Sequence, residues 1–341
     1  MPETVTQTPM LSAAQGIPCV IPCVDIAPFL NEMDKAGVAR EFGKALEEIG
    51  FVVITGHGIP ETLSQETYRQ AIAFFDLSLE KKLEATLPDR MANRGYIPLG
   101  IDSVAATRNE QTPPDLCEAL MFVNLVRENP DRFQVGIDPD SGNLWPMDPA
   151  VLRASFLNFS QALLGLSHTL MRISALALDL PEEYFLPFLE PNGGVLRAVH
   201  YPDQQEKPLP GQLRYGAHSD YGGLTILLQD QAPGGLQVCL RSGEWVDVKP
   251  LPNSFVINVG DLIARWTNDR WRSTLHRVIN PPRNLSGSTR RLSLVYFTGP
   301  RADAWIECLP TCQSESNPPR YEAVRAGEYI RSKIEASVVK A

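Results

Sequence analysis

The stretch AHSDYGGLTILLQD, residues 217–230, joins a histidine and an aspartate two positions apart to a run rich in leucine and β-branched residues. Further short runs of this kind follow, and turn residues such as Pro233-Gly234-Gly235 separate them. Many short strands at close spacing predict a β-barrel or a two-sheet jelly roll. The expected strands are residues 195–201, 224–229, 236–240, 245–248, 255–259, 276–279 and 292–297.

Helical patterns come earlier in the chain than most of these strands. Residues 150–178 carry a single apolar stripe, which predicts a long helix packed against the sheet. Shorter helices are expected at residues 38–49 and 61–75, with a strand at 51–55 between them. Residues 81–150 contain many charges, prolines and glycines, and we expect a loop region that serves function there. Helices followed by strands indicate an α+β fold.

Composition excludes several function classes. The chain has 341 residues, 43% of them hydrophobic, and a net charge of -9, which argues against a nucleic-acid partner. No apolar run approaches the roughly 20 residues needed to span a bilayer. The first residues lack the basic and apolar regions of a signal peptide. We therefore expect a cytoplasmic, monomeric protein with no membrane partner.

His218 and Asp220 are expected on one strand, where residues two apart point to the same face and Ser219 points away. A third ligand must come from another strand, and His276 begins such a run. Two imidazoles and a carboxylate, without a thiolate, match the facial triad of non-haem Fe(II) oxygenases. The sequence therefore predicts an iron site formed by His218, Asp220 and His276.

Arg291 and Ser293 are also two positions apart, fifteen residues after His276, so both should face the same space. The planar fork of arginine suits a carboxylate such as the far C5 carboxylate of 2-oxoglutarate. Tyr201 and Arg197 share a face of another expected strand. We expect Tyr201 to contact the co-substrate; Arg197 either receives an anionic group of the primary substrate or forms an ion pair.

Long segments of the chain resemble a known family. They include GFVVITGHGIP (50–60), AHSDYGGLTILLQD (217–230), WVDVKPLPNSFVINVGDLIARWTN (245–268) and RLSLVYF (291–297). From about Ile21 to Ile334 the chain is similar to the isopenicillin-N-synthase-like branch of the Fe(II)- and 2-oxoglutarate-dependent dioxygenases. The resemblance implies a distorted double-stranded β-helix, a jelly-roll core with flanking helices and one long backing helix.

The same resemblance implies roles for the candidate site. His218, Asp220 and His276 match the family's iron ligands, and Arg291 with Ser293 matches its Arg-x-Ser, which binds the 2-oxoglutarate C5 carboxylate. Tyr201 matches the last tyrosine of the family's Asn-Tyr-Tyr-Pro segment. The chain departs from that segment because Val199 and His200 replace Asn-Tyr, which puts one polar co-substrate contact in doubt.

The activity implied is oxidation of a small molecule by hydroxylation, desaturation or ring formation, with Fe(II), 2-oxoglutarate and O2, yielding succinate and CO2. One alternative is an oxidase of the isopenicillin N synthase type, in which Arg-x-Ser holds substrate and 2-oxoglutarate is not used. Another is a non-enzymatic jelly roll that binds a metabolite. Expected substrate-pocket residues are Arg94, Tyr96, Met121, Arg197 and Phe297. The arginines among them favour an anionic molecule, such as an amino acid or a specialised metabolite.

The expected organisation has five parts. A disordered leader covers residues 1–17 and an N-terminal dioxygenase region covers 18–145. The backing helix follows at 146–190, then the Fe(II)/2-oxoglutarate jelly-roll core at 191–302. A C-terminal helical segment, 303–341, should contribute to the substrate pocket.

Overall fold

The computed structural model describes residues 20–87, 94–108, 110–128, 136–138, 141–146, 150–190, 193–204 and 206–337. The predicted leader, residues 1–17, lies outside these ranges.

The larger of two facing sheets has eight strands in the order β1-β2-β12-β9-β14-β7-β4-β3. Its first pair is parallel, and the other neighbours are antiparallel. The apolar runs of these strands bury side chains on both faces of the sheet, because one face meets helices and the other lines a cavity. In sheet order the strands are Cys23–Asp25, Phe51–Thr55, Phe255–Val259, Leu224–Gln229, Arg291–Phe297, Val195–Tyr201, Glu118–Val123 and Gly95–Ile97.

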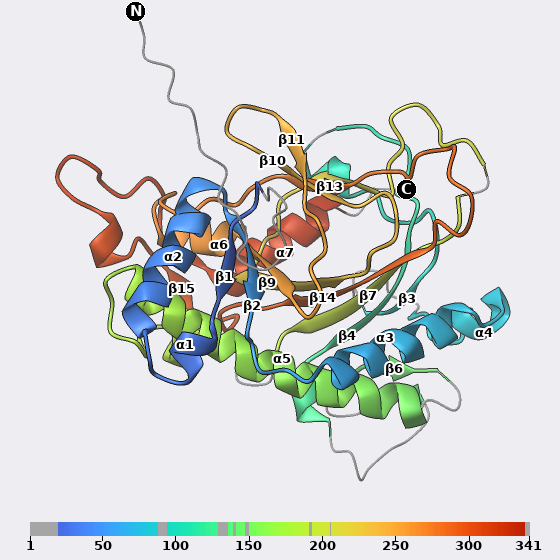
Figure 1. Cartoon of the computed structure of the whole chain (residues 1–341), viewed down its shortest axis with the longest axis horizontal. Helices are drawn as coiled ribbons and strands as arrows, with labels where there is room; N and C mark the ends of the chain where they lie inside the picture. Colours follow the sequence, from blue (N-terminus) through green and yellow to red (C-terminus); the bar gives the residue numbers. More distant parts are fainter. Residues whose placement is uncertain are drawn as a thin grey trace, which may run out of the picture.

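The smaller sheet has the order β11-β10-β13-β8 and lies over the inner face of the larger one (Figure 1). Its strands are Trp245–Asp247, Leu236–Cys239, His276–Val278 and Tyr215–His218. Both sheets line one cavity of about 760 Å³. The predicted α+β chain with a two-sheet jelly-roll core is therefore confirmed.

Three helices cover the outer face of the larger sheet (Figure 1): α2 (Lys35–Glu48), α3 (Glu61–Phe75) and the long α5 (Ala150–Ala177). The apolar stripe of α5 is buried, with Phe156 and Phe159 fully enclosed. The shorter elements are α1 (Ala27–Leu30), α4 (Leu79–Leu83), η2 (Val104–Arg108), η3 (Leu125–Arg127), β5 (Gly136–Ile137), β6 (Leu144–Trp145), η4 (Leu186–Phe188), α6 (Asp261–Trp266), β15 (Trp305–Ile306), η5 (Pro310–Cys312), β16 (Val324–Arg325) and α7 (Ala326–Ser337).

The element predictions hold best where apolar patterns are long. The strands expected at 195–201, 224–229 and 255–259 have the predicted bounds, as does the helix expected at 61–75. The segment expected to be loop also contains β3 and β4, which extend the larger sheet at one edge. Strand β8 ends at His218, so Asp220 follows the strand instead of lying within it.

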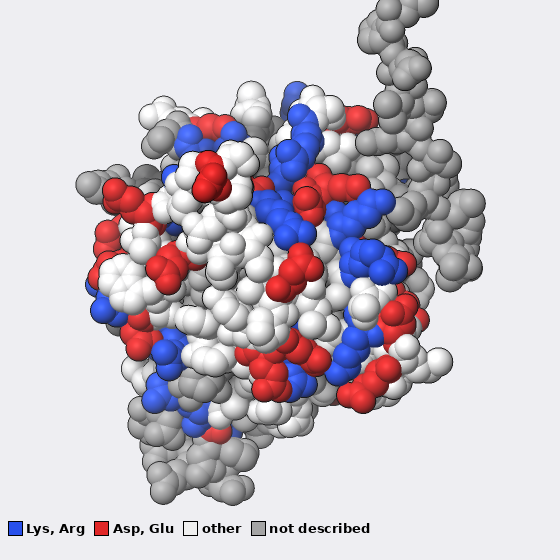
Figure 2. Space-filling view, turned by 90° about the vertical axis from the view of Figure 1, so that its left-hand side faces the viewer, with Lys and Arg blue, Asp and Glu red and all other residues white. Residues whose placement is uncertain are grey.

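On the face of the molecule that carries α1 and α2, acidic and basic side chains are interspersed (Figure 2). Arg270, for example, forms ion pairs with Glu47 at 3.4 Å and Asp179 at 4.0 Å. No helix in the described part of the chain combines the length and apolar character needed to cross a membrane.

Candidate metal and co-substrate site

His218 and His276 are cross-strand neighbours. His218 is the last residue of β8, His276 is the first of β13, and the antiparallel register pairs them directly. Their ring centroids are 4.1 Å apart. Nδ1 of His218 lies 2.9 Å from the carbonyl oxygen of Gly216, and Nδ1 of His276 lies 3.1 Å from that of Thr274. Because a carbonyl can only accept, both protons are held on Nδ1, and both Nε2 lone pairs are free for a metal.

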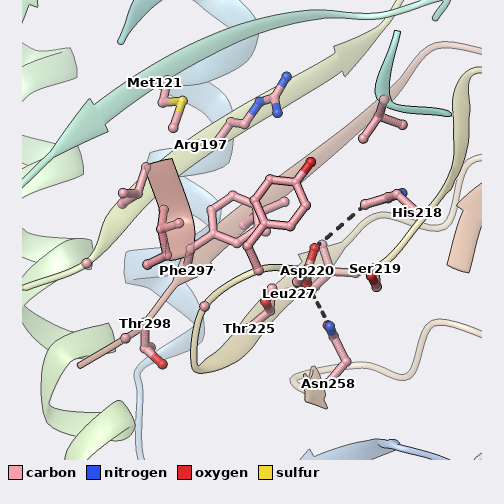
Figure 3. A pocket seen from close by; sticks show the side chains of 18 of the residues that line it. Met121, Arg197, His218, Ser219, Asp220, Thr225, Leu227, Asn258, Phe297 and Thr298 are labelled. Carbon is pink, nitrogen blue, oxygen red and sulfur yellow. Dashed lines mark hydrogen bonds and ion pairs between the residues drawn. The ribbon is translucent and has the colours of Figure 1, made fainter. Parts of the chain in front are cut away.

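Asp220 completes the cluster. Its Oδ1 lies 3.7 Å from Nε2 of each histidine, and the three ligand atoms are all within 4.8 Å of one another. Its Oδ2 accepts hydrogen bonds from Thr225 Oγ1 at 2.6 Å and Asn258 Nδ2 at 2.7 Å (Figure 3). These two donors come from strands β9 and β12 of the larger sheet and fix the carboxylate with Oδ1 toward the histidines. The set of two imidazoles and one carboxylate fits Fe(II).

The protonation states suit a metal site. Burial and the neighbouring His276 lower the pKa of His218, so its imidazole is neutral near pH 7. Burial alone would raise the pKa of Asp220, but the two histidines and the hydrogen bonds from Thr225 and Asn258 outweigh it and hold that pKa below its usual value. The cluster therefore includes a neutral His218 imidazole and an ionised Asp220 carboxylate. Ser219, expected to point away, also lines the cavity.

Arg291 begins β14 and is 1% exposed. Its Nη2 donates to Gln229 Oε1 at 2.8 Å, and its Nη1 donates to Asp230 Oδ1 and the Ala232 carbonyl, both at 3.2 Å. Its Nε is buried and has no hydrogen-bond partner within the described ranges. The guanidinium is thus fixed in place with donor capacity remaining.

Tyr201 and Ser293 lie beside this arginine. The antiparallel pair β7 and β14 places Arg291 opposite Tyr201 and Ser293 opposite Val199. Arg291, Ser293 and Tyr201 line the same cavity as the three metal-site residues. Burial raises the pKa of Tyr201, so its hydroxyl stays protonated and able to donate. Arg290 faces the opposite side, where its Nε donates to His200 Nε2 at 2.7 Å.

Three of the five expected substrate-pocket residues line the cavity: Met121, Arg197 and Phe297 (Figure 3). Met121 on β4 is the register partner of Arg197 on β7, and Phe297 ends β14. Apolar residues of α7, Ile330 and Ile334, line the cavity as well, as expected for the C-terminal segment.

The prediction was wrong for Tyr96 and Arg94. Tyr96 is 2% exposed and lies on the helix side of the sheet, where its ring packs against Phe74 at 5.8 Å and its hydroxyl donates to Glu118. Arg94 precedes β3, and its Nη1 donates to the Ser141 carbonyl at 2.8 Å. Neither lines the cavity. The anionic-substrate hypothesis therefore depends on Arg197, which forms an ion pair with Asp102.

Several side chains that shape the site were not predicted. Thr225 and Asn258 orient Asp220, and Asp102 and Tyr215 contact Arg197. The only signal for Thr225 and Asn258 was a polar residue inside an otherwise apolar strand, which indicates a buried polar contact. Asp102 lies in a loop, where the sequence carries no periodicity.

Comparison with known proteins gives the family. Residues 192–300 match the model described as 2OG-Fe(II) oxygenase superfamily, and residues 21–147 match that of the non-haem dioxygenase in morphine synthesis N-terminal region. A 2-oxoglutarate-Fe(II) type oxidoreductase of Emericella nidulans is 31% identical, over 95% of this chain and 92% of the relative. The chain belongs to the 2OG-Fe(II) oxygenase superfamily.

Other relatives support the same conclusion about this oxygenase. Homoarginine-6-hydroxylase of Glycine max is 32% identical, over 92% of this chain and 96% of its own. Among solved structures, a full-length Neurospora crassa protein in complex with alpha-KG and thymine matches with a TM-score of 0.81 and 32% identity, over 93% and 97% of the two chains. The chain is thus an oxygenase that uses Fe(II), 2-oxoglutarate and O2, and the two alternative hypotheses, the oxidase and the non-enzymatic binder, are disfavoured.

Proposed function

We infer that this oxygenase oxidises a compact small molecule in the 760 Å³ cavity, with His218, Asp220 and His276 as iron ligands and Arg291, Ser293 and Tyr201 as the 2-oxoglutarate site. The observation that carries the proposal is the approach of the three ligand atoms to within 4.8 Å of one another, on the wall of the cavity that Arg291 also lines. The names of relatives, among them a homoarginine hydroxylase and a protein crystallised with thymine, support a small-molecule substrate.

Iron held by His218, Asp220 and His276 would supply the O2 chemistry, and the protein supplies position and protonation state. The carbonyls of Gly216 and Thr274 hold the two imidazoles in the required tautomer. Thr225 and Asn258 hold the carboxylate. Arg291 would hold the far carboxylate of 2-oxoglutarate, and the Tyr201 and Ser293 hydroxyls, which line the same cavity, would donate to the same molecule. The apolar side chains of Met121, Phe297 and α7 exclude water from the substrate.

A second buried cation, Arg214, lies beside Tyr201 without lining the cavity. It is 1% exposed, and its hydrogen bonds go to the carbonyls of Pro233, Gly234 and Thr289, so no carboxylate of the described residues pairs with it. Its guanidinium carbon lies 5.9 Å from the ring centre of Tyr201. Burial, and then Arg291, lower its pKa to about 10, which leaves it charged at neutral pH. Asp230 forms an ion pair with Arg291 and offsets its positive charge. The additional positive charge of Arg214 would make the site attractive to the carboxylate of 2-oxoglutarate.

The Arg214→Gln variant should therefore bind 2-oxoglutarate about tenfold more weakly, because it removes a positive charge that lies near the carboxylate without contacting it. Anaerobic calorimetric titration measures this, and 2-oxobutyrate, which lacks the far carboxylate, should bind both proteins equally. The exposed Arg283→Gln is the matched control. Equal loss for both 2-oxo acids would contradict an electrostatic role for Arg214.

The proposed activity is tested by measuring O2 uptake and succinate in protein reconstituted with Fe(II), with and without 2-oxoglutarate, over a panel of small molecules. We expect succinate to form with O2 consumption only when 2-oxoglutarate is present, and faster with a true substrate. Substrate-driven O2 uptake without 2-oxoglutarate would instead support the oxidase alternative. Hydroxylation is the outcome we propose first, with desaturation and ring formation as the other product classes to examine.

The cytoplasmic location, the monomeric state, the absence of a nucleic-acid partner and a role in specialised metabolism stay predictions from the sequence, as do the boundaries of the five chain parts.

A further inference from the structure

The cavity wall contains an ion pair that the iron and 2-oxoglutarate sites do not use. Arg197 projects from β7, between Met121 of β4 and Val295 of β14, and is 8% exposed. Its Nη1 donates to the Tyr215 hydroxyl at 2.9 Å, and its Nη2 donates to Oδ2 of Asp102. Asp102, whose side chain is 28% exposed, also lines the cavity. A buried arginine and a partly open carboxylate therefore stand side by side in the substrate space.

This pair lies close to the metal site. The ring of Tyr215 packs edge-on against that of His218, with centroids 4.9 Å apart, so Arg197 is linked to an iron-ligand candidate through one aromatic side chain. Figure 3 shows Arg197, Met121 and Phe297 on one side of the cavity and His218, Asp220 and Asn258 on the other. A molecule that contacts Arg197 thus lies beside the residues that would hold iron.

Both members keep hydrogen-bonding capacity. The guanidinium has more N–H donors than its bonds to Tyr215 and Asp102 use. The only hydrogen bond of the Asp102 side chain within the described residues is made through Oδ2, which leaves Oδ1 as a free acceptor. The wall therefore presents a donor and an acceptor next to each other, with no net charge.

Charge pairing decides which ligand this wall accepts. A carboxylate would approach an arginine whose charge is already balanced, and Asp102 would repel it. A cation would approach a carboxylate whose charge is already balanced by Arg197, and Arg197 would repel it. A neutral group with a carbonyl and an N–H on the same edge satisfies both residues at once, which a lactam, cyclic imide or cyclic ureide provides. The apolar side chains of Met121, Val295 and Phe297 offer surfaces for the faces of such a ring.

We propose that Asp102 and Arg197 recognise the amide edge of a neutral, ring-shaped substrate, with Asp102 accepting from its N–H and Arg197 donating to its carbonyl. This rests on the proposed oxygenase function and names its substrate class, and it replaces the anionic substrate expected from the sequence. Asp102 and Arg197 are accordingly residues that determine specificity.

The test compares three flat six-membered ring compounds that differ in charge: uracil (neutral), nicotinate (anionic) and benzamidine (cationic). Each is titrated calorimetrically, without O2, into protein loaded with Fe(II) and 2-oxoglutarate. We expect uracil to bind at least about tenfold more tightly than either charged compound.

Two variants give opposite expected shifts. Asp102→Asn removes the negative charge and should move the preference toward nicotinate by about tenfold or more, whereas Arg197→Gln should move it toward benzamidine. Asp102 is partly exposed, so its variant should fold even if the Arg197 variant does not. Asp247→Asn removes the same charge from an exposed side chain on β11, outside the cavity, and should leave the order of the three affinities as it is.

A preference of the native protein for nicotinate or benzamidine would overturn the inference, as would an Asp102→Asn variant with the native order of affinities. Binding of 2-oxoglutarate to the native protein is measured first in the same cell. If 2-oxoglutarate fails to bind, the proposed function is contradicted. If 2-oxoglutarate binds but the protein does not bind uracil more tightly than the two charged compounds, only the substrate inference is contradicted.

Discussion

Replacing Asp220 with asparagine is expected to lower 2-oxoglutarate-dependent O2 uptake by more than about a hundredfold. Mutation of a residue that only hydrogen-bonds a metal ligand already costs about 10- to 100-fold in metal affinity or activity, and loss of a ligand itself should cost more. The amide oxygen of asparagine can still accept from Thr225 and Asn258, while its nitrogen would face the two histidines. The variant thus keeps the buried hydrogen bonds and loses the anionic ligand atom. Its thermal stability without metal should remain close to that of the native protein.

Metal-dependent stability separates this effect from misfolding. At a metal concentration about 100 times the dissociation constant, the native protein should gain about 2.7 kcal/mol in its free energy of unfolding. Mn(II) is a suitable ion for this thermal measurement because no O2 chemistry accompanies it. The gain should disappear in Asp220→Asn and persist in Asp247→Asn, a change of an exposed carboxylate on β11. Equal stabilisation of both variants by metal would show that Asp220 is not a ligand.

Arg291→Ala should weaken 2-oxoglutarate binding by roughly 30- to 5,000-fold, since truncating one partner of a buried charge pair costs about 2–5 kcal/mol. The guanidinium is almost fully buried and held by Gln229, Asp230 and Ala232, so its position needs little reorganisation when the co-substrate enters. The rate at saturating 2-oxoglutarate should fall much less than the affinity. Titration of 2-oxoglutarate against succinate formation measures both quantities.

The neighbouring Arg290→Ala variant is a close control for this prediction. Arg290 is one position earlier on the chain and contacts His200 at 2.7 Å and Asp76 at 2.7 Å on the opposite side of the sheet. We expect its 2-oxoglutarate affinity to stay within about fivefold of the native value, because Arg290 does not line the cavity and its partly exposed pair with Asp76 is worth about 0–1 kcal/mol. Comparable losses in both variants would contradict the assignment of Arg291 as the clamp.

The three residues predicted as iron ligands come together because His218 and Asp220 are close in the chain and a single strand pairing adds His276. His218 ends β8 on the cavity side, Asp220 follows it and is oriented by Thr225 and Asn258, and the register of β13 with β8 brings His276 beside them. Side-chain alternation within a strand does hold on β14, where Arg291 and Ser293 both line the cavity. The long strands and α5 have apolar patterns that leave little choice of which face is buried.

The prediction failed where the elements are short. Strand β3 has three residues, Gly95–Ile97, so its pattern does not indicate which face meets the cavity. Its pairing with β4 decides the matter, and that pairing turns Tyr96 toward α3 and Glu118. Asp102 comes from a loop, whose position depends on contacts distant in sequence, such as the hydrogen bond from the Asp115 N–H to its carbonyl at 2.8 Å.

The ion-pair partner of Arg197 and the burial of Arg214 could not be predicted from the sequence. Arg197 was recognised as a possible anion receptor, but only the folded chain brings Asp102 against it. Arg214 resembles a surface arginine in the sequence, yet it is enclosed beneath Tyr201 and held by backbone carbonyls. The charge balance of the cavity and of its surroundings therefore depends on contacts between segments that are distant in the sequence.

Anaerobic calorimetric titration of 2-oxoglutarate into the native protein, with and without Fe(II), tests the central claim most directly. If the three ligands and the clamp form one site, 2-oxoglutarate should bind to a single site per chain and at least about tenfold more tightly when Fe(II) is present. The Asp220→Asn variant should lose that iron-dependent gain while Arg290→Ala keeps it. Binding of equal strength with and without Fe(II) would contradict the account.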